Sequence, residues 1–231
     1  ARITLLVNTL CRVVPGKLKQ LDVGNGQMFG VSFSNQIYTM YSTGWILVPG
    51  SLKHVSVGPA GVWGVDSNNY IYKLVGGDWV VVSGLLTQVD AGGMNSPAGV
   101  NMNDDIFCLP WGQGSSWINI IGELKYYNCG PYSCWGVKAA DEIYIMKDVT
   151  PSFCAGSMNW EQIPRALSMI EVSTDGKVFG DIYERDGVSM SNPAGTGWHQ
   201  VQHPQKVKHV SYDLGHLWLI KANNSIMDCT E

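Results

Sequence analysis

Oxygen-bearing side chains recur at one position of a short segment that returns six times along the chain. The copy Gly50–Gly58 reads GSLKHVSVG, and near-copies begin at Gly16, Gly84, Gly122, Arg165 and Gln205. One position of this segment carries a carboxylate, an amide or a hydroxyl in every copy: Asp22, Ser56, Asp90, Asn128, Glu171 and Ser211. Hard cations such as calcium take oxygen ligands of this kind.

Three carboxylates brought into one layer repel each other unless water or a cation lies between them. We therefore predict a calcium ion near Asp22, Asp90, Asn128 and Glu171, provided that the six copies meet around one axis. The alternative is a water-filled channel that the same side chains line.

A second polar set lies about ten residues after the repeated segment in three of the copies. It comprises the runs Asp66–Asn69, Asn101–Asp105 and Lys138–Glu142. Such groups could bind the hydroxyl and acetamido groups of a sugar, and the predicted contacts are Asp66, Asn68, Asn69, Asn101, Asn103, Asp104, Asp105, Lys138 and Asp141. Alternatively, the Asn and Asp side chains close turns through Asx hydrogen bonds.

Catalytic signatures are absent from the sequence: it contains no GxSxG, HExxH, Walker or GxGxxG motif. A sialidase needs an arginine cluster, yet the chain has four arginines, and Ser173–Gly176 lacks the spacing of an Asp-box. His54 and His209 share one repeat position, which favours packing over catalysis. The sequence therefore predicts a protein that is not an enzyme.

Tryptophans also recur once per unit, at Trp45, Trp79, Trp117, Trp160 and Trp198. An indole can stack on a sugar ring, but a residue required in every unit is more typical of packing between units. Trp111, in an insertion, is out of register with the others. It is either exposed or a loop anchor.

The spacing of the repeats predicts the architecture. The leucine-type positions 18, 52, 86, 124, 167 and 207 lie 34, 34, 38, 43 and 40 residues apart, which is the period of a repeat fold. Each unit contains four short runs of β-branched and aromatic residues separated by turn residues, and no helical apolar stripe. We therefore predict an all-β, six-bladed propeller of four-stranded antiparallel blades, formed by a single domain over residues 1–231.

The two ends of the chain support closure of this ring. Cys11–Gly16 aligns with Trp45–Gly50 as a fourth strand without a preceding three, while the last unit stops after its third strand at Cys229. The N-terminal strand should therefore complete the last blade. An open array is less compatible, because it would leave two incomplete blades unpaired.

This alignment also pairs the six cysteines. Cys11 and Cys229 fall on neighbouring strands of the closing blade, and Cys129 and Cys134 flank one hairpin turn. Cys108 and Cys154 remain as the third pair. Three disulfides are typical of a secreted protein.

Composition restricts the partners. The net charge is −4 with only 15% charged residues and no basic run, so the sequence predicts no nucleic-acid partner and instead recognition of a neutral molecule. No apolar run is long enough for membrane insertion, and the start of the chain contains no signal h-region, as expected of a mature chain. The sequon at Asn223 predicts glycosylation of an extracellular protein.

Several runs are similar to a known family almost residue for residue: GSLKHVSVGPAG, GVNMNDDIFCL, LKYYNCGPYSCWGV, LSMIEVSTDG and KHVSYDLG. Over essentially the whole chain, the sequence resembles the fish-egg lectins of the tectonin family, which are related to the tachylectins. The resemblance implies a closed six-bladed propeller with calcium in its central tunnel. It also implies binding of N-acetylglucosamine-type glycans on microbial or egg surfaces in innate defence.

In that family the sugar sites lie between the second and third blades and between the fourth and fifth. Here the first crevice would be bordered by Asp66–Asn69 and Asn101–Asp105, and the second by Lys138–Glu142. The chain departs from the pattern in unit five, where the run Phe179–Tyr183 almost deletes one turn. If the polar runs only form turns, the sugar site should lie on the opposite rim, around Pro59, Met94 and Tyr132.

The function expected from these observations is that of a secreted, non-catalytic lectin with N-acetylglucosamine-containing glycans as partners. A homodimer is compatible with this expectation. The alternative is a propeller scaffold that binds another protein through one rim and has no physiological sugar ligand.

Overall fold

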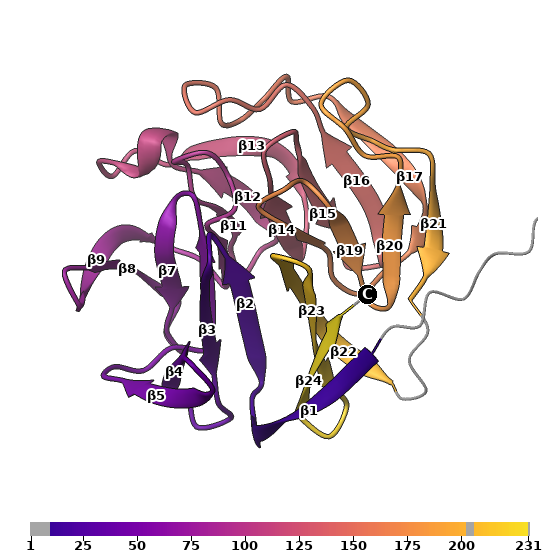
Figure 1. Ribbon diagram of the computed structural model, residues 1–231. Helices are drawn as coiled ribbons and strands as arrows, with labels where there is room; N and C mark the ends of the chain where they lie inside the picture. The colour runs from indigo at the N-terminus through magenta and orange to yellow at the C-terminus, as the bar shows by residue number, and fades with distance from the viewer. Residues whose placement is uncertain (1–9, 202–205, 231) are drawn as a thin grey trace, which may run out of the picture.

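Six four-stranded antiparallel sheets are arranged around a central axis (Figure 1). The computed structural model describes residues 10–201 and 206–230. Blade 1 consists of β2 (Gln20–Gly24), β3 (Gln27–Val31), β4 (Ile37–Tyr41) and β5 (Gly44–Val48). Blade 2 consists of β6 (His54–Gly58), β7 (Gly61–Val65), β8 (Tyr70–Val75) and β9 (Asp78–Leu85). Blade 3 consists of β10 (Gln88–Asp90), β11 (Ala98–Val100), β12 (Asp105–Cys108) and β13 (Ile118–Glu123).

The second half of the ring continues in the same strand order. Blade 4 consists of β14 (Tyr126–Cys129), β15 (Cys134–Val137), β16 (Glu142–Met146) and β17 (Trp160–Ala166). Blade 5 consists of β18 (Glu171–Val172), β19 (Val178–Gly180), β20 (Tyr183–Asp186) and β21 (Gly197–Gln200). Blade 6 consists of β22 (Val207–Asp213), β23 (His216–Lys221), β24 (Ser225–Thr230) and β1 (Leu10–Lys17). The six-bladed all-β prediction is confirmed.

The N-terminal strand closes the ring as predicted. β1 pairs antiparallel with β24, and the two lie side by side in Figure 1 although they come from opposite ends of the chain. Cys11 lies opposite Cys229, and a disulfide joins them. The other two predicted disulfides, Cys108–Cys154 and Cys129–Cys134, are also present.

The hydrophobic core lies between blades rather than within one sheet. One cluster, for example, packs Val31 and Ile37 of blade 1 against Leu52 and Val55 of blade 2. The leucine-type repeat positions are all buried, with exposed fractions of at most 9%: Leu18, Leu52, Leu86, Leu124, Leu167 and Val207. Each unit therefore depends on its neighbour to bury its apolar face, which is why the sequence period is visible at these positions.

The recurring tryptophans link neighbouring blades, as the packing interpretation predicts. Trp79 packs against the core between blades 1 and 2, and its indole Nε1 donates to the Pro49 carbonyl of blade 1 at 3.0 Å. The equivalent bonds reach the preceding blade from Trp45, Trp117, Trp160 and Trp198. Gly50, with φ +124°, lies under Trp79, where an added Cβ would approach the indole to 2.9 Å.

Two segments depart from the regular repeat, the shortened turn of blade 5 and the Trp111 insertion. In blade 5, Gly180 pairs directly with Tyr183, the first residue of β20, and leaves Asp181 and Ile182 in a two-residue turn. The Trp111 insertion forms a short 3-10 turn, η1 (Pro110–Gly112). Among the described residues, no helix is long and apolar enough to cross a bilayer.

Candidate functional site

The oxygen-bearing repeat position forms a ring of hydrogen bonds between the innermost strands. Asp22 Oδ2 accepts the Val57 amide of blade 2 at 2.8 Å, and Asp90 Oδ2 accepts the Cys129 amide of blade 4 at 2.8 Å. The same contact to the next blade is made by Ser56, Asn128 and Ser211. This side-chain layer therefore has a structural role, since it satisfies backbone amides that the blades do not pair among themselves.

Glu171 is the exception in this ring. Its carboxylate accepts the Tyr126 hydroxyl at 2.5 Å and the Asn128 amide at 2.9 Å, so both partners belong to blade 4. Burial raises the pKa of Glu171 well above its ordinary value, and the charges of Asp22 and Asp90 raise it further. His209 of the next strand lies farther away, with Nε2 3.8 Å from Glu171 Oε1, so Glu171 is a buried acid held mainly by side chains of blade 4.

A second set of hydrogen bonds between neighbouring blades is formed by the side chains two residues before the oxygen-bearing position. Gln88 donates from Nε2 to the Tyr127 carbonyl at 2.8 Å and accepts the Tyr127 amide at 2.9 Å, and Gln20 does the same with Val55. His209 contacts the Leu21 carbonyl at 2.8 Å from the equivalent position. The prediction that the repeat-position histidines are packing residues therefore agrees with the geometry.

The carboxylate layer has the chemistry of a cation site but lacks a complete set of free ligands. Burial raises the pKa of Asp22 to about 6 and, with the charge of Asp22 added, that of Asp90 to about 8. Ser56 Oγ lies 2.9 Å from Asp22 and 3.4 Å from Asp90, so one hydroxyl separates the two carboxylates. Protein donors already occupy both oxygens of Asp22 and Oδ2 of Asp90.

The fit of a metal to this layer is therefore limited. Across the described ranges, no group of three or more His, Cys, Asp or Glu side chains is placed to hold a metal ion. Oxygen donors suit calcium, but an ion here would need water for most of its coordination shell. The four predicted ligands do share one layer, and calcium binding there stays a prediction.

The predicted sugar contacts lie in the turns between the second and third strands. Asp66 Oδ1 accepts the amides of Asn68 and Tyr70 at 2.9 and 3.0 Å. In the next blade, Asn101 Oδ1 accepts the amides of Asn103 and Asp105, both at 2.9 Å. These are Asx turns, so the turn-forming alternative accounts for the two side chains that begin the runs.

The remaining residues of these runs also have structural partners or lie at turn corners. Asn69, Asp104 and Asp141 have φ values of 70°, 63° and 64°, a conformation that Asn and Asp tolerate better than most residues. The Lys138 ammonium lies 4.7 Å from the centroid of the Tyr144 ring. The structure places the runs on separate blade tips, and their sugar-binding role stays a prediction.

Open clefts lie at the opposite end of the blades, where the first strand turns into the second. One cleft, between blades 2 and 3, has a volume of about 420 Å³ and is lined by Ala60, Lys73, Asn95, Trp111 and Gln113. The equivalent cleft between blades 6 and 1 has a volume of about 260 Å³. Both can admit a small ligand, and they lie on the rim that the sequence analysis gave as the alternative.

The cleft between blades 2 and 3 combines an exposed aromatic ring with amides. Trp111 is 54% exposed on the η1 turn, and its amide donates to Ser96 Oγ at 3.2 Å. The Lys73 ammonium lies 5.4 Å from the buried Trp63 ring. An exposed indole beside two carboxamides, Asn95 and Gln113, offers a stacking face and directional hydrogen bonds.

The cleft between blades 6 and 1 has a charged wall. The buried Asp228 carboxylate accepts Arg12 Nε at 3.0 Å and contacts His216 Nδ1 at 2.7 Å. Met28 and Trp218 add apolar surface to the same lining. This cleft therefore differs in chemistry from the one between blades 2 and 3, although the repeat places both at the same position.

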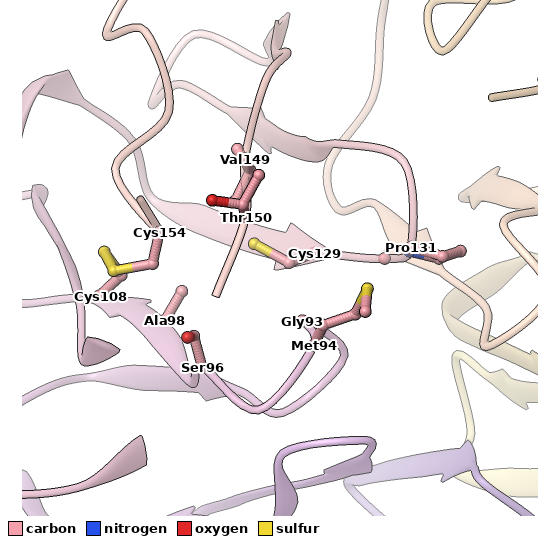
Figure 2. Close-up of a pocket in the computed structure, with 11 residues that line it drawn as sticks. Gly93, Met94, Ser96, Ala98, Cys108, Cys129, Pro131, Val149, Thr150 and Cys154 are labelled. Carbon is pink, nitrogen blue, oxygen red and sulfur yellow. A yellow bond between two sulfur atoms is a disulfide. The ribbon is translucent and has the colours of Figure 1, made fainter. Parts of the chain in front are cut away.

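Between blades 3 and 4 the corresponding cleft is nearly filled. Figure 2 shows the Cys108–Cys154 disulfide beside Ala98, with Val149 and Thr150 of the long blade 4 loop above them. The remaining cavity is about 20 Å³, which is room for roughly one water molecule. The loop that this disulfide anchors thus removes one cleft from the set available to ligands.

Sequence reasoning missed most of the cleft residues because each comes from a different strand or loop. Lys73 lies in β8, opposite Trp63 of β7, whereas Asn95 and Gln113 belong to two loops of the next blade. Trp111 did carry a signal, since it is the tryptophan out of register with the repeat. Trp111 is thus marked by its departure from the repeat, whereas the recurring tryptophans link neighbouring blades.

The fold and clefts define a disulfide-linked six-bladed propeller whose blades meet at small-ligand clefts. The family model of the tectonin domain matches residues 17–222, and the chain is 56% identical to the fish-egg lectin of Cyprinus carpio over 232 residues. That alignment covers 95% of this chain and 98% of the carp protein. The protein therefore belongs to the tectonin family.

Solved structures share the fold at low sequence identity. A gluconolactonase from Xanthomonas campestris matches with a TM-score of 0.69 and 8% identity over 97% of this chain and 90% of its own. Virginiamycin B lyase from Staphylococcus aureus matches with a TM-score of 0.62 and 14% identity over 91% of this chain and 79% of its own. At such identities the likeness concerns the propeller fold alone.

Proposed function

We propose that this protein is a lectin that binds N-acetylglucosamine-type glycans in the clefts between blades. The observation that carries the proposal is the open cleft between blades 2 and 3, with the exposed Trp111 ring beside Asn95 and Gln113. A neutral, hydroxylated ligand suits this lining, because an indole packs on the apolar face of a sugar and carboxamides bind its polar groups. The 56% identity to a fish-egg lectin supports the same class.

The proposal includes an extracellular, non-catalytic role in recognising microbial or egg surfaces. Three disulfides and the exposed Asn223 sequon are compatible with secretion and glycosylation. Weak single sites would gain avidity on a surface that displays many copies of one glycan, the more so in a homodimer. A protein-binding scaffold is the competing function, and a glycan array would separate the two.

Calorimetry with N-acetylglucosamine tests the cleft. We expect Trp111→Ala to weaken binding about tenfold or more, which corresponds to a loss of about 1.4 kcal/mol, because it removes the stacking face. Phe153→Ala is the matched control, since Phe153 is 71% exposed but does not line this cleft. If Trp111→Ala and the wild type bind the sugar with equal affinity, this cleft is not the sugar site.

The blade tips are tested in the same titrations. The double variant Asn101→Ala and Asp104→Ala removes polar groups from one predicted tip. If the tip binds sugar, the variant should lose affinity by about 1 to 3 kcal/mol. If the cleft binds the sugar, the double variant should keep its affinity and Trp111→Ala should lose affinity. The two possible sites therefore give opposite results.

We also propose that a hydrated calcium ion lies in the carboxylate layer. Three buried carboxylates, Asp22, Asp90 and Glu171, share this layer, and a cation would reduce their mutual repulsion. Binding to the native state alone should raise the melting temperature with added calcium and lower it with a chelator. A melting temperature that responds to neither would contradict the proposal.

A further inference from the structure

Four lysines occupy one repeat position at the start of the first strand of their blades: Lys19, Lys53, Lys125 and Lys208. Each ammonium donates to a side-chain oxygen 16 residues later, on the turn between the second and third strands of the same blade. In Lys19 the distance from Nζ to Asn35 Oδ1 is 2.6 Å. The repeat thus holds four ammonium groups in one fixed arrangement.

The partner oxygen divides these lysines into two kinds. Lys125 is paired with the carboxylate of Asp141, so its charge is neutralised. Lys53 and Lys208 donate instead to the neutral amides of Asn69 and Asn224, as Lys19 does to Asn35. In the described part of the chain, none of these three ammonium groups forms an ion pair. An amide partner fixes their position and leaves their charge available.

The three lysines with amide partners come from consecutive blades. Lys208 belongs to blade 6, Lys19 to blade 1 and Lys53 to blade 2, and the first strands of these blades contact each other in that order. Burial lowers the pKa of Lys19, and the charges of Lys53 and Lys208 lower it further, so the three are close enough to repel. A chain with a net charge of −4 therefore contains a local concentration of positive charge.

One carboxylate, Asp66, offsets the charge of Lys53 in part but forms no ion pair with it among the described residues. Asp66 raises the pKa of Lys53, but its Oδ1 accepts the amides of Asn68 and Tyr70 and its Oδ2 accepts the Tyr72 hydroxyl. Asp66 is therefore committed to its turn, and Lys53 donates to Asn69.

An exposed aromatic ring lies against this group. Phe33, on the loop between β3 and β4, is 64% exposed, and the Lys208 ammonium lies 4.9 Å from its ring centroid. The contact crosses from blade 6 to blade 1. Exposed aromatic rings supply stacking surfaces for planar or sugar-ring ligands, and this one adjoins three cations.

We propose that Lys19, Lys53, Lys208 and Phe33 form a second binding site, for a saccharide that carries a phosphate or sulfate group. The ammonium groups bind the tetrahedral oxyanion and Phe33 packs against the sugar ring. This site lies on the face opposite the open clefts, so a glycan surface could be contacted through either end of the propeller. It goes beyond the proposed lectin function and does not depend on a sugar in the clefts.

Titrations monitored by NMR with N-acetylglucosamine 6-phosphate, inorganic phosphate and N-acetylglucosamine test the site. The phosphosugar should shift the amide signals of residues 19, 33, 53 and 208, and its affinity should fall at least tenfold in the triple variant Lys19→Gln, Lys53→Gln, Lys208→Gln. Raising the salt concentration should weaken this binding, since exposed charges are screened. Lys125→Gln is the matched control and should bind as wild type, because Asp141 already neutralises Lys125.

Inorganic phosphate separates a free-anion site from a sugar-phosphate site. If the sugar ring contributes, the phosphosugar should bind more tightly than inorganic phosphate, and Phe33→Ala should remove the difference. Equal affinity of wild type and the triple variant for the phosphosugar would overturn the proposal. If the wild type does not bind N-acetylglucosamine at all, the function proposed for the clefts is contradicted instead. Failure of the phosphosugar site and failure of the cleft function are therefore distinguishable.

Discussion

Removing the Cys11–Cys229 disulfide should cost far more stability than removing another disulfide of the same chain. This bond joins residues 218 apart in the sequence and holds the first described strand to the last. In the chain-entropy model, cross-linking so long a loop stabilises the native state by about 5 kcal/mol. The double variant Cys11→Ala, Cys229→Ala should lose most of this free energy of unfolding.

The matched control is the Cys129–Cys134 disulfide, whose cysteines are only 5 residues apart. The same relation gives about 2 kcal/mol for so short a loop. In both pairs the cysteines lie opposite each other on antiparallel strands with Cα atoms 4.0 Å apart, so the two bonds have the same cross-strand placement. The difference between the two variants therefore isolates loop length.

Urea denaturation followed by circular dichroism measures both variants. The Cys11–Cys229 variant should have the lower midpoint, and its loss of stability should exceed that of the control by about 3 kcal/mol. An equal or smaller loss would refute the closure argument, because it would mean that strand pairing alone keeps β1 on β24. Non-reducing peptide mapping of the wild type verifies that the bonds compared are the ones formed.

Other measurements address the inner rings and the tips. Gln88→Leu should lower the free energy of unfolding by about 2 to 4 kcal/mol in urea titrations, since it leaves both buried backbone groups of Tyr127 unpaired. Burial lowers the pKa of His54 to about 3 in the native state. The unfolded chain therefore binds more protons between about pH 6.5 and 3, and stability should fall on acidification by up to about 1.4 kcal/mol per pH unit. His54→Gln should reduce the dependence of stability on pH in this range. An unchanged dependence would contradict the lowered pKa of His54. Asn101→Ala should lower the melting temperature through loss of its Asx turn, and an unchanged value would contradict that role.

The fold was predictable because each unit must satisfy the same inter-blade contacts. A leucine such as Leu52 packs into the neighbouring blade, and the tryptophan of each fourth strand bonds to the blade before it. These requirements recur at a fixed period, so the sequence displays them six times. Closure was predictable for the same reason, since Cys11 and Cys229 complete one unit between them.

The candidate site was much less predictable, because the repeated polar residues serve the backbone. The amide of Asn101 and the carboxylates of Asp66 and Asp22 satisfy nearby N–H groups, which explains their recurrence without a ligand. The open clefts combine residues from two blades and three loops, and their lining changes from cleft to cleft. Sequence spacing alone does not show which of these loops meet.

Departures from the repeat are therefore the more informative positions for function in this fold. At the lysine position the departure is Asp141, whose carboxylate neutralises Lys125. The amides of Asn35, Asn69 and Asn224 accept from their lysines in the same way but leave the positive charge available. The insertion that places Trp111 beside Asn95 adds an aromatic face to one cleft, whereas the Cys108–Cys154 disulfide fills another. Because the shared hydrogen bonds already hold the ring closed, such changes can diversify binding on either face without disturbing the core.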